Sequence, residues 1–318
     1  MNKEFKNLEE QIAILEFKGM TIEDKEYAKE VLLRENYFFL NGYRHLFLKS
    51  ETDKKFLPGT TFNELYSLFL FDREFRNIIF KNLLLVENNA KSIISYQLSK
   101  KYGYKENEYL KPKNFTERRD KQRQVLDIIK KMKRQVRTNA PQHSATAHYV
   151  MNYGYIPLWV LVKVLSFGIV GELYQILKRD DQNAIAEVYH MNADTLTEYL
   201  PILSNYRNLC AHEDIVFENR TQRTISDTIY HSMLGIPKMD DEYIYGKNDL
   251  FALLIMIKQM LTDVEFKNMT LELGHALNNL KMNLHTIEIE KVLDKMGFPI
   301  NWEQLANINK KVKEWEGK

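Results

Sequence analysis

The sequence has 318 residues, of which 44% are hydrophobic and 28% are charged, and its formal net charge is +2. This is the composition of an ordinary globular protein, long enough for one large or two ordinary domains. The single cysteine, Cys210, excludes an internal disulfide and a thiolate metal cluster. The N-terminal residues are charged and no run of 18 apolar residues occurs, so we expect a cytoplasmic protein that is neither exported nor embedded in a membrane.

Apolar residues recur with helical spacing and almost never alternate as in strands, which predicts an all-α fold. Residues 1–58 form the first expected unit, a small N-terminal helical lobe with helices at 5–17 and 22–35, the second capped by Thr21. The aromatic stretch 36–47 follows. Tyr43 and Arg44 within it could stack on or bind RNA, although so dense an aromatic cluster is also typical of a core. The turn at residues 58–61 ends the lobe.

Residues 59–225 form the expected central bundle. Its pattern predicts two long helices at 62–80 and 81–102, and shorter helices at 159–165, 169–177, 180–190 and 193–205. Glu87 lies on the apolar face of the second long helix. A carboxylate there has to be paired, most plausibly with an arginine such as Arg207. Such a pair could orient a catalytic arginine, or it could be purely structural.

The charge of the chain is unevenly distributed. Between residues 100 and 137 there are 14 Lys or Arg residues and five acidic residues, most of them in a basic helix expected at 115–137 before a loop at 138–146. An excess of nine positive charges favours a nucleic-acid surface over a merely solvated helix face. The candidate RNA-binding residues of this segment are Arg118, Arg119, Lys121, Arg123, Lys130, Lys131, Lys133 and Arg134.

The C-terminal part, residues 226–318, is expected to be a helical extension that packs on the central bundle. Its periodicity predicts helices at 226–234, 249–261, 264–284 and 289–296.

Arg207 and His212 form the candidate catalytic pair, with four residues between them at the end of an apolar helical pattern. Arg137 and His143 have a similar spacing, but they lie in a polar segment with a proline, which reads as a loop. Residues five apart on an ideal helix point about 140° from each other. Arg207 and His212 therefore converge only if the helix kinks or ends there, or if each meets its counterpart from a second copy of the chain. This geometry favours a homodimer, which is the expected form of the protein.

This pair suits RNA cleavage in which the 2′-OH of the RNA attacks the neighbouring phosphorus. A histidine can transfer the proton near neutral pH, and an arginine can hold the phosphate oxygens. Asn208 could position His212 or the phosphate, or it could simply cap the helix end. Cys210 is read as a small packing residue, since nothing marks it as an activated thiolate. The sequence has no metal-binding motif, so no metal or other cofactor is expected.

Arg207, Asn208 and His212, with Asn219 and Arg220, resemble the Arg-polar-x-x-x-His motif of the HEPN superfamily. The surroundings are similar to the abortive-infection (Abi) family, in particular its AbiD/AbiF-like members. Three stretches carry this resemblance: NYFFLNGYRHLF at 36–47, FRNIIFKNLLLVENNAKSII at 75–94 and IPLWVLVKVLSFGIVGELYQIL at 156–177. Lys91 departs from the family pattern, which leads us to expect an arginine at that position.

The resemblance implies a HEPN-like helical bundle and a metal-independent endoribonuclease toxin of phage defence. It also implies a structured non-coding RNA partner that restrains the toxin. Two alternatives stay open: an RNA-binding scaffold that no longer cleaves, and a protein-interaction module of a toxin-antitoxin or defence system.

Overall fold

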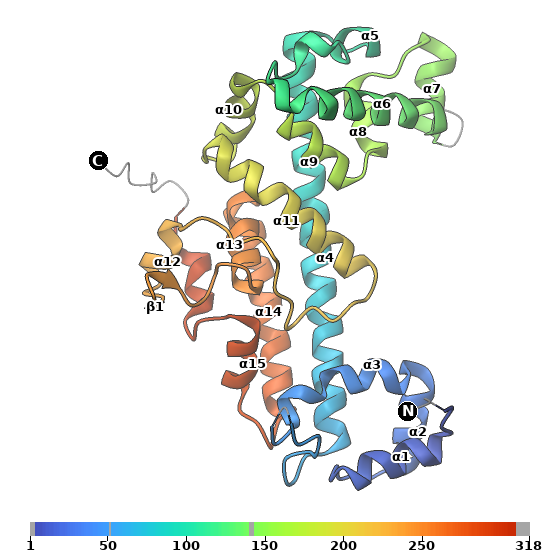
Figure 1. The fold of residues 1–318 in the computed structure, drawn as a ribbon, viewed down its shortest axis with the longest axis vertical. Helices are drawn as coiled ribbons and strands as arrows, with labels where there is room; N and C mark the ends of the chain where they lie inside the picture. Colours follow the sequence, from blue (N-terminus) through green and yellow to red (C-terminus); the bar gives the residue numbers. More distant parts are fainter. Residues whose placement is uncertain (1–3, 51, 140–142, 310–318) are drawn as a thin grey trace.

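The computed structural model describes residues 4–50, 52–139 and 143–309, and it is all-α apart from one short hairpin. Its central feature is α4, a single helix of 41 residues, Phe62–Tyr102, that runs through most of the long axis of the molecule (Figure 1). At 1.5 Å per residue this helix is about 60 Å long. A capping box between Thr61 and Glu64 begins it, and Gly103, with a φ of +90°, ends it.

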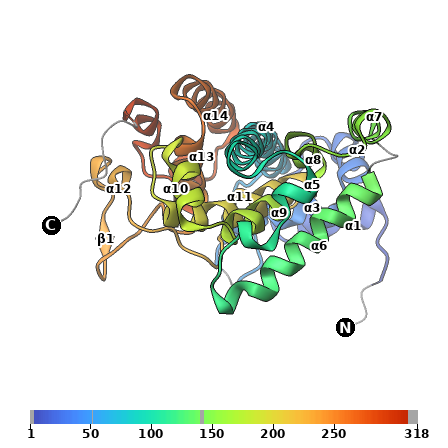
Figure 2. The ribbon, with the colours of Figure 1, turned by 90° about the horizontal axis from the view of Figure 1, so that it is seen from above.

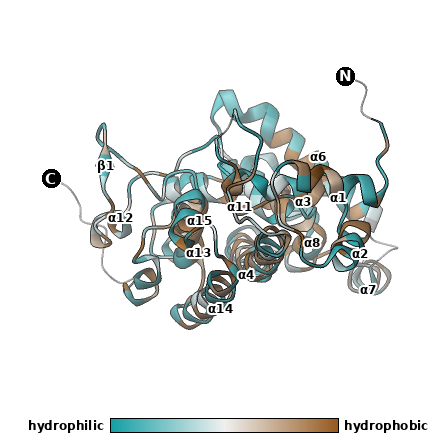
Figure 3. Cartoon of the chain, turned by 90° about the horizontal axis from the view of Figure 1, so that it is seen from below, coloured by the Kyte–Doolittle hydropathy of each residue, from teal (hydrophilic) through white to brown (hydrophobic). Residues whose placement is uncertain are grey.

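The prediction of two helices at 62–80 and 81–102 was therefore wrong. Neither proline nor glycine interrupts the junction, and Ile79 and Leu83 on its two sides are both fully buried. Continuous packing on both sides of residue 80 keeps the helix intact. Figure 2 shows α4 and α14 side by side, seen nearly end-on, and Figure 3 shows hydrophilic and hydrophobic bands alternating along both.

The N-terminal segment packs α3 and the following 3₁₀ turn against α4. The second helix begins at Lys25 rather than at residue 22, because Asp24 and not Thr21 is its cap: the Asp24 side chain accepts a hydrogen bond from Tyr27 N. Thr21 instead pairs with Thr61 in an isolated β-bridge. The elements of this segment are α1 Leu8–Phe17, α2 Lys25–Glu35, α3 Tyr37–Gly42 and the 3₁₀ helix Tyr43–Phe47.

The basic helix, α6, begins at Gln122 and not at residue 115, since a bridge between Phe115 and Leu177 and a 3₁₀ turn at Arg119–Lys121 occupy the preceding residues. Part of the expected loop at 138–146 is helical: α6 continues to Asn139 and α7 begins at Ser144, while residues 140–142 lie outside the described chain. The helices of this region are α5 Glu106–Tyr109, α6 Gln122–Asn139, α7 Ser144–Tyr153, α8 Leu158–Val164, α9 Phe167–Gln175, α10 Arg179–Glu187 and α11 Ala193–Ala211.

The C-terminal helices pack along the lower half of α4, with α14 in the longest contact (Figure 1). α13 is buried on nearly every side, and its residues Leu250–Ile257 are all at most 2% exposed. The observed bounds of α15 agree with the predicted helix at 289–296. The elements are α12 Ile229–Met233, β1 Lys238–Met239, β2 Glu242–Tyr243, α13 Leu250–Met260, α14 Asp263–Asn283, α15 Ile289–Met296 and a 3₁₀ helix Trp302–Asn307. None of the helices in the described part of the chain is long and apolar enough to cross a membrane.

His231 makes the stability of the C-terminal part dependent on pH. The ring is fully buried, its Nδ1 accepts a hydrogen bond from Thr228 N at 3.0 Å, and its Nε2 lies 2.9 Å from the carbonyl oxygen of Gly246. Burial lowers the pKa of His231 below its usual 6.5. Just below pH 6.5, His231 therefore binds a proton in the unfolded chain but stays neutral in the folded chain. We expect the free energy of unfolding to fall as the pH drops below about 6.5, by at most about 1.4 kcal/mol per pH unit.

Urea unfolding from pH 7.5 to 5 measures this slope. The His231→Gln variant should show a flatter profile below pH 6.5 than the parent. His275→Gln, which changes an exposed histidine on α14, should keep the slope of the parent. Equal slopes for His231→Gln and the parent would contradict the assignment.

Candidate functional site

Glu87 on α4 and Arg207 on α11 form an ion pair where the two helices pack together. Arg207 Nε donates to Glu87 Oε2 at 3.0 Å, so the pairing expected from the sequence is present. The guanidinium also lies over the ring of Phe80, 5.7 Å from its centroid. Glu87 is only 5% exposed, whereas the Arg207 side chain is 31% exposed. The carboxylate thus holds the arginine by Nε, and the terminal Nη atoms make no hydrogen bond to any residue that the structure describes.

Lys91 shares the same carboxylate. Its Nζ donates to Glu87 Oε1 at 2.6 Å, one helical turn along α4, and its side chain is 9% exposed. Lys91 therefore keeps a cationic contact with Glu87 at the position where the family pattern leads us to expect arginine. One buried carboxylate between two cations leaves a net positive charge, and Arg207 carries that charge to the surface.

Helix α11 ends between Arg207 and His212. Ala211 is its last residue, and the backbone N–H of His212 donates to the carbonyls of Asn208 and Leu209. Glu213 follows with a φ of +58°, a left-handed conformation that reverses the chain direction. α11 thus ends only at His212, after five helical residues from Arg207 to Ala211, so the helix end by itself does not turn the two side chains towards each other. His212 and Asn208 are both exposed, and His212 is the C-cap residue; the Asn208 carbonyl accepts the hydrogen bond from its N–H.

The segment after His212 is fixed by Asp72, a fully buried residue of α4. Its carboxylate accepts hydrogen bonds from Phe217 N at 2.6 Å and Val216 N at 3.1 Å. It also accepts a hydrogen bond from the Tyr43 hydroxyl at 2.7 Å. Arg76, one turn further along α4, donates to the carbonyl oxygen of Asp214 at 3.1 Å. Burial raises the pKa of Asp72, and the hydrogen bonds that it accepts oppose this rise.

Sequence reasoning missed this anchor. The available signal was an Asp and an Arg four residues apart among apolar residues such as Phe71 and Phe75, a spacing that puts both on one buried face. Gly42 and Tyr43 of the aromatic stretch also pack against the segment that follows His212. A Cβ on Gly42 would come within 2.6 Å of Ile215 Cδ1, so glycine leaves room for the chain that follows His212.

The aromatic stretch corrects one predicted site residue. Tyr43 is 3% exposed, its ring stacks on Phe217, and its hydroxyl donates a hydrogen bond to Asp72. It is therefore a core residue, and its ring is not accessible to an RNA base. Arg44 is partly buried, and its Nε is buried without a hydrogen-bond partner in the described structure.

The predicted basic residues fall into two groups. Three of them are engaged locally: Arg118 with Asp120, Lys121 with the carbonyl of Gln175, and Lys131 with Asp127 and Glu172. The others are exposed and form no ion pair with any residue in the described ranges. This second group consists of Arg119, Arg123, Lys130, Lys133 and Arg134, and Arg137 shares its properties.

A polar cavity of about 420 Å³ lies between α6, α9 and α11. It is bounded by Lys131 and Glu172 on one side and by Pro201 and Ser204 of α11 on the other. Ser204 is one turn before Arg207 on the chain. The cavity therefore joins the basic helix to the helix that carries the candidate catalytic arginine.

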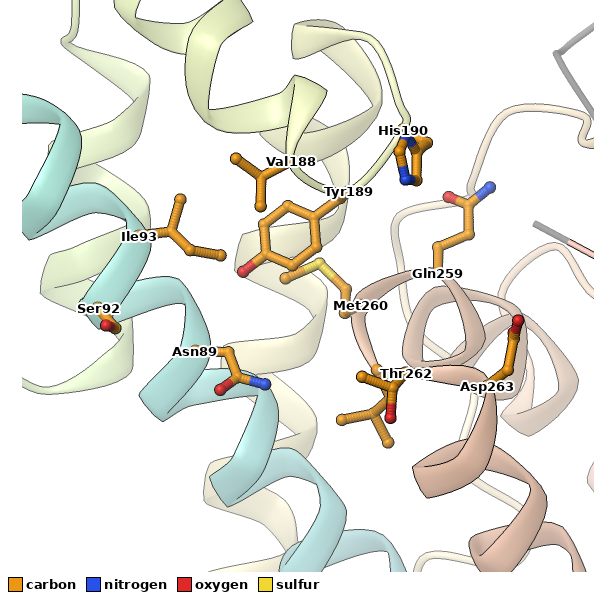
Figure 4. Close-up of a pocket in the computed structure, with 11 residues that line it drawn as sticks. Asn89, Ser92, Ile93, Val188, Tyr189, His190, Gln259, Met260, Thr262 and Asp263 are labelled. Carbon is orange, nitrogen blue, oxygen red and sulfur yellow. The ribbon is translucent and has the colours of Figure 1, made fainter. Parts of the chain in front are cut away.

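A second cavity, of about 390 Å³, lies between α4, the end of α10 and the junction of α13 with α14 (Figure 4). Tyr189 projects into its centre, and the Tyr189 hydroxyl is buried without a hydrogen-bond partner in the described structure. Asn89 lines the cavity only two residues from Glu87, which places it about 200° around α4. This cavity is therefore on the other side of α4 from Arg207, and none of the predicted site residues lines it.

Cys210 is buried on α11, and burial raises the pKa of its thiol to about 12. A thiol with that pKa is protonated at neutral pH and is a poor nucleophile, in agreement with the packing role expected from the sequence. Among the residues that the structure describes, no three His, Cys, Asp or Glu side chains cluster as metal ligands would.

The chain is thus an all-helical protein in which a buried glutamate holds an arginine near a helix end that carries a histidine. A family model described as Abi-like protein matches residues 30–218, more than half of the chain, so the protein belongs to the Abi-like family. The matched range includes α4, α6, α11 and the segment anchored by Asp72. Searches of curated proteins and of solved structures found no match.

Proposed function

We propose that this protein is a HEPN-type endoribonuclease that acts in the cytoplasm as an abortive-infection effector against phage. Membership in the Abi-like family supports the defence role. The observation that carries the enzymatic role is the arrangement at the end of α11. Glu87 fixes Arg207 through Nε and leaves the Nη atoms without a hydrogen bond to the described residues, and the exposed His212 follows at the first residue beyond the helix.

In the proposed reaction the 2′-OH of the RNA attacks the adjacent phosphorus, and the bond from phosphorus to the 5′ oxygen breaks. The two free Nη groups of Arg207 hold the phosphate oxygens and stabilise the negative charge that develops on them. His212 takes the proton of the 2′-OH or gives a proton to the leaving 5′ oxygen. The Asn208 side chain is one turn from His212 and can hydrogen-bond the phosphate. The products carry a 2′,3′-cyclic phosphate and a 5′-OH.

A second copy of the site would supply the complementary proton donor or acceptor, so we propose that the active form is a homodimer. The exposed cations of α6 would hold the RNA backbone and make binding strongly dependent on salt. Resemblance to AbiF-like proteins supports a structured non-coding RNA that restrains the enzyme. The exposed cations on α6 also favour a second candidate function, an RNA-binding scaffold without cleavage.

Incubation of the purified protein with total cellular RNA in EDTA tests the proposal. We expect cleavage, with 2′,3′-cyclic phosphate ends on the upstream products and 5′-OH ends on the downstream ones. The control is the same protein after high-salt removal of bound RNA, since a restraining RNA would block the site. Tight RNA binding without cleavage in both preparations would favour the scaffold. Absence of RNA binding would contradict both functions and favour a protein-interaction module.

A further inference from the structure

The end of α4, α7 and the start of α8 lie beside the basic helix (Figure 1). Aromatic side chains from these three places form a chain of ring contacts. Successive ring centroids are 5.4 to 6.2 Å apart. Three of the rings are well exposed: Tyr104 at 40%, Tyr153 at 56% and Trp159 at 45%. In order, the chain consists of Tyr149 with His148, then Tyr153, Tyr155, Tyr104 and Trp159.

We infer that this aromatic chain, which we call the stacking ladder, binds unpaired RNA bases, so that single-stranded RNA is held by the ladder and by α6 together. This inference rests on the proposed RNA-directed function and extends it to a new site. Aromatic faces next to cations are the general means by which proteins hold single strands, because every base offers a face for stacking whatever its sequence.

The charges around the ladder favour an RNA strand. Lys105 Nζ lies over the rings of Tyr104 and Tyr155, at 5.8 and 5.2 Å from their centroids. Two carboxylates of the adjoining helix α5 are bonded to the backbone: Glu106 accepts a hydrogen bond from Ile156 N, and Glu108 accepts hydrogen bonds from Tyr104 N and Lys105 N. The ladder therefore presents rings and a cation, which suits a polyanion whose bases are exposed.

The basic helix continues this surface. α7 packs against both α6 and α8, so the helix that carries Tyr153 is in contact with the helix that carries the exposed cations. Cations that follow the phosphates and rings that take the bases are the two parts of a single-strand site. A duplex would engage only the cations, because its bases are stacked on one another.

The test is binding of a fluorescent, 2′-O-methylated oligouridine of about 12 nucleotides, within the site sizes known for single-strand-binding folds. This probe cannot be cut by 2′-OH attack, so binding is measured apart from cleavage. We expect the double variant Tyr153→Ala/Trp159→Ala to bind about tenfold or more weakly, as loss of stacked bases requires. The double variant should bind a duplex of equal length as tightly as the parent does. The salt dependence of its RNA affinity should also have the slope of the parent.

Two variants serve as controls. Tyr153→Phe/Trp159→Phe keeps the rings and should bind within about twofold of the parent. Tyr96→Ala removes an exposed ring of α4, 64% exposed, that is outside the ladder, and should have no effect. The substituted side chains Tyr153, Trp159 and Tyr96 are exposed, so thermal unfolding should be nearly unchanged in each variant.

The outcomes distinguish failure of the stacking ladder from failure of the proposed RNA-directed function. Suppose that the alanine double variant binds the single strand like the parent, while Lys130→Ala/Lys133→Ala binds it more weakly. Base binding by the stacking ladder is then contradicted, and the RNA-directed function stands. If the parent binds neither single strand nor duplex, both fail. Concentration-dependent self-association that is lost in the alanine double variant, with RNA affinity unchanged, would assign the ladder to contact with a second copy of the chain and would overturn the inference.

Discussion

Cleavage of RNA by the His212→Ala variant is expected to be about 10²- to 10⁴-fold slower than by the parent, the range that a general acid or base contributes. His212 is exposed beyond the end of α11, and its side chain supports no other residue through a hydrogen bond in the described structure. The variant should therefore unfold at the temperature of the parent and keep its affinity for RNA. Initial rates on a fluorogenic RNA oligonucleotide, with binding of its 2′-O-methylated form, separate the two effects.

The chain contains its own control for this prediction. His143 is exposed and follows Arg137 at nearly the same spacing, but it precedes α7, and within the described ranges Arg137 forms no ion pair with a buried acid of the Glu87 type. His143→Ala should cleave at the rate of the parent. Arg207→Ala should lose activity as His212→Ala does, and the double variant should lose little more, since the two residues act on one transition state. A rate for His212→Ala within threefold of the parent would remove the histidine from the mechanism.

The ion pair of Glu87 with Arg207 was predictable because a buried carboxylate is costly unless a cation pairs with it. An acid on the apolar face of a helix has to meet a cation, and few arginines follow in an apolar helical segment. The spacing left open a helix end or a homodimer; α11 does end at His212, but its residues up to Ala211 are helical, so the homodimer stays a prediction. The bounds of α15 were predictable for a related reason, since its apolar residues repeat at 3.6-residue spacing between clear stop signals.

Other features depend on contacts that no local pattern encodes. The stretch around residue 80 looked like a junction between two helices, but α8, α11 and α14 cover α4 on successive sides and keep it continuous. Tyr43 has the same local sequence whether it faces RNA or Asp72, and only the approach of residues 214–217, far along the chain, decides the matter. The stacking ladder joins Tyr104 to rings some 50 residues later, so spacing could not reveal it.

Replacing Asp72 by alanine is expected to lower the free energy of unfolding by about 3–5 kcal/mol, the cost of breaking a buried charged network. The change removes the acceptor for two backbone N–H groups, strands the Tyr43 hydroxyl, and leaves Arg76, which is 5% exposed, without its carboxylate. Each unsatisfied buried donor costs about 1–3 kcal/mol. Urea unfolding followed by circular dichroism gives the difference.

Glu74→Ala is the matched control, because Glu74 is exposed two residues further along α4 and forms no ion pair with a described residue; its stability should stay within about 0.5 kcal/mol of the parent. Asp72→Asn keeps the shape and one oxygen acceptor, so we expect a smaller loss of stability and a folded protein at 25 °C. Since residues 214–217 follow His212 directly, this variant should still cleave RNA more slowly than Glu74→Ala does. If Asp72→Ala proved as stable as Glu74→Ala, the carboxylate would not be the anchor of this segment. If Asp72→Asn cleaved like the parent, the anchor would serve stability alone and would not position His212.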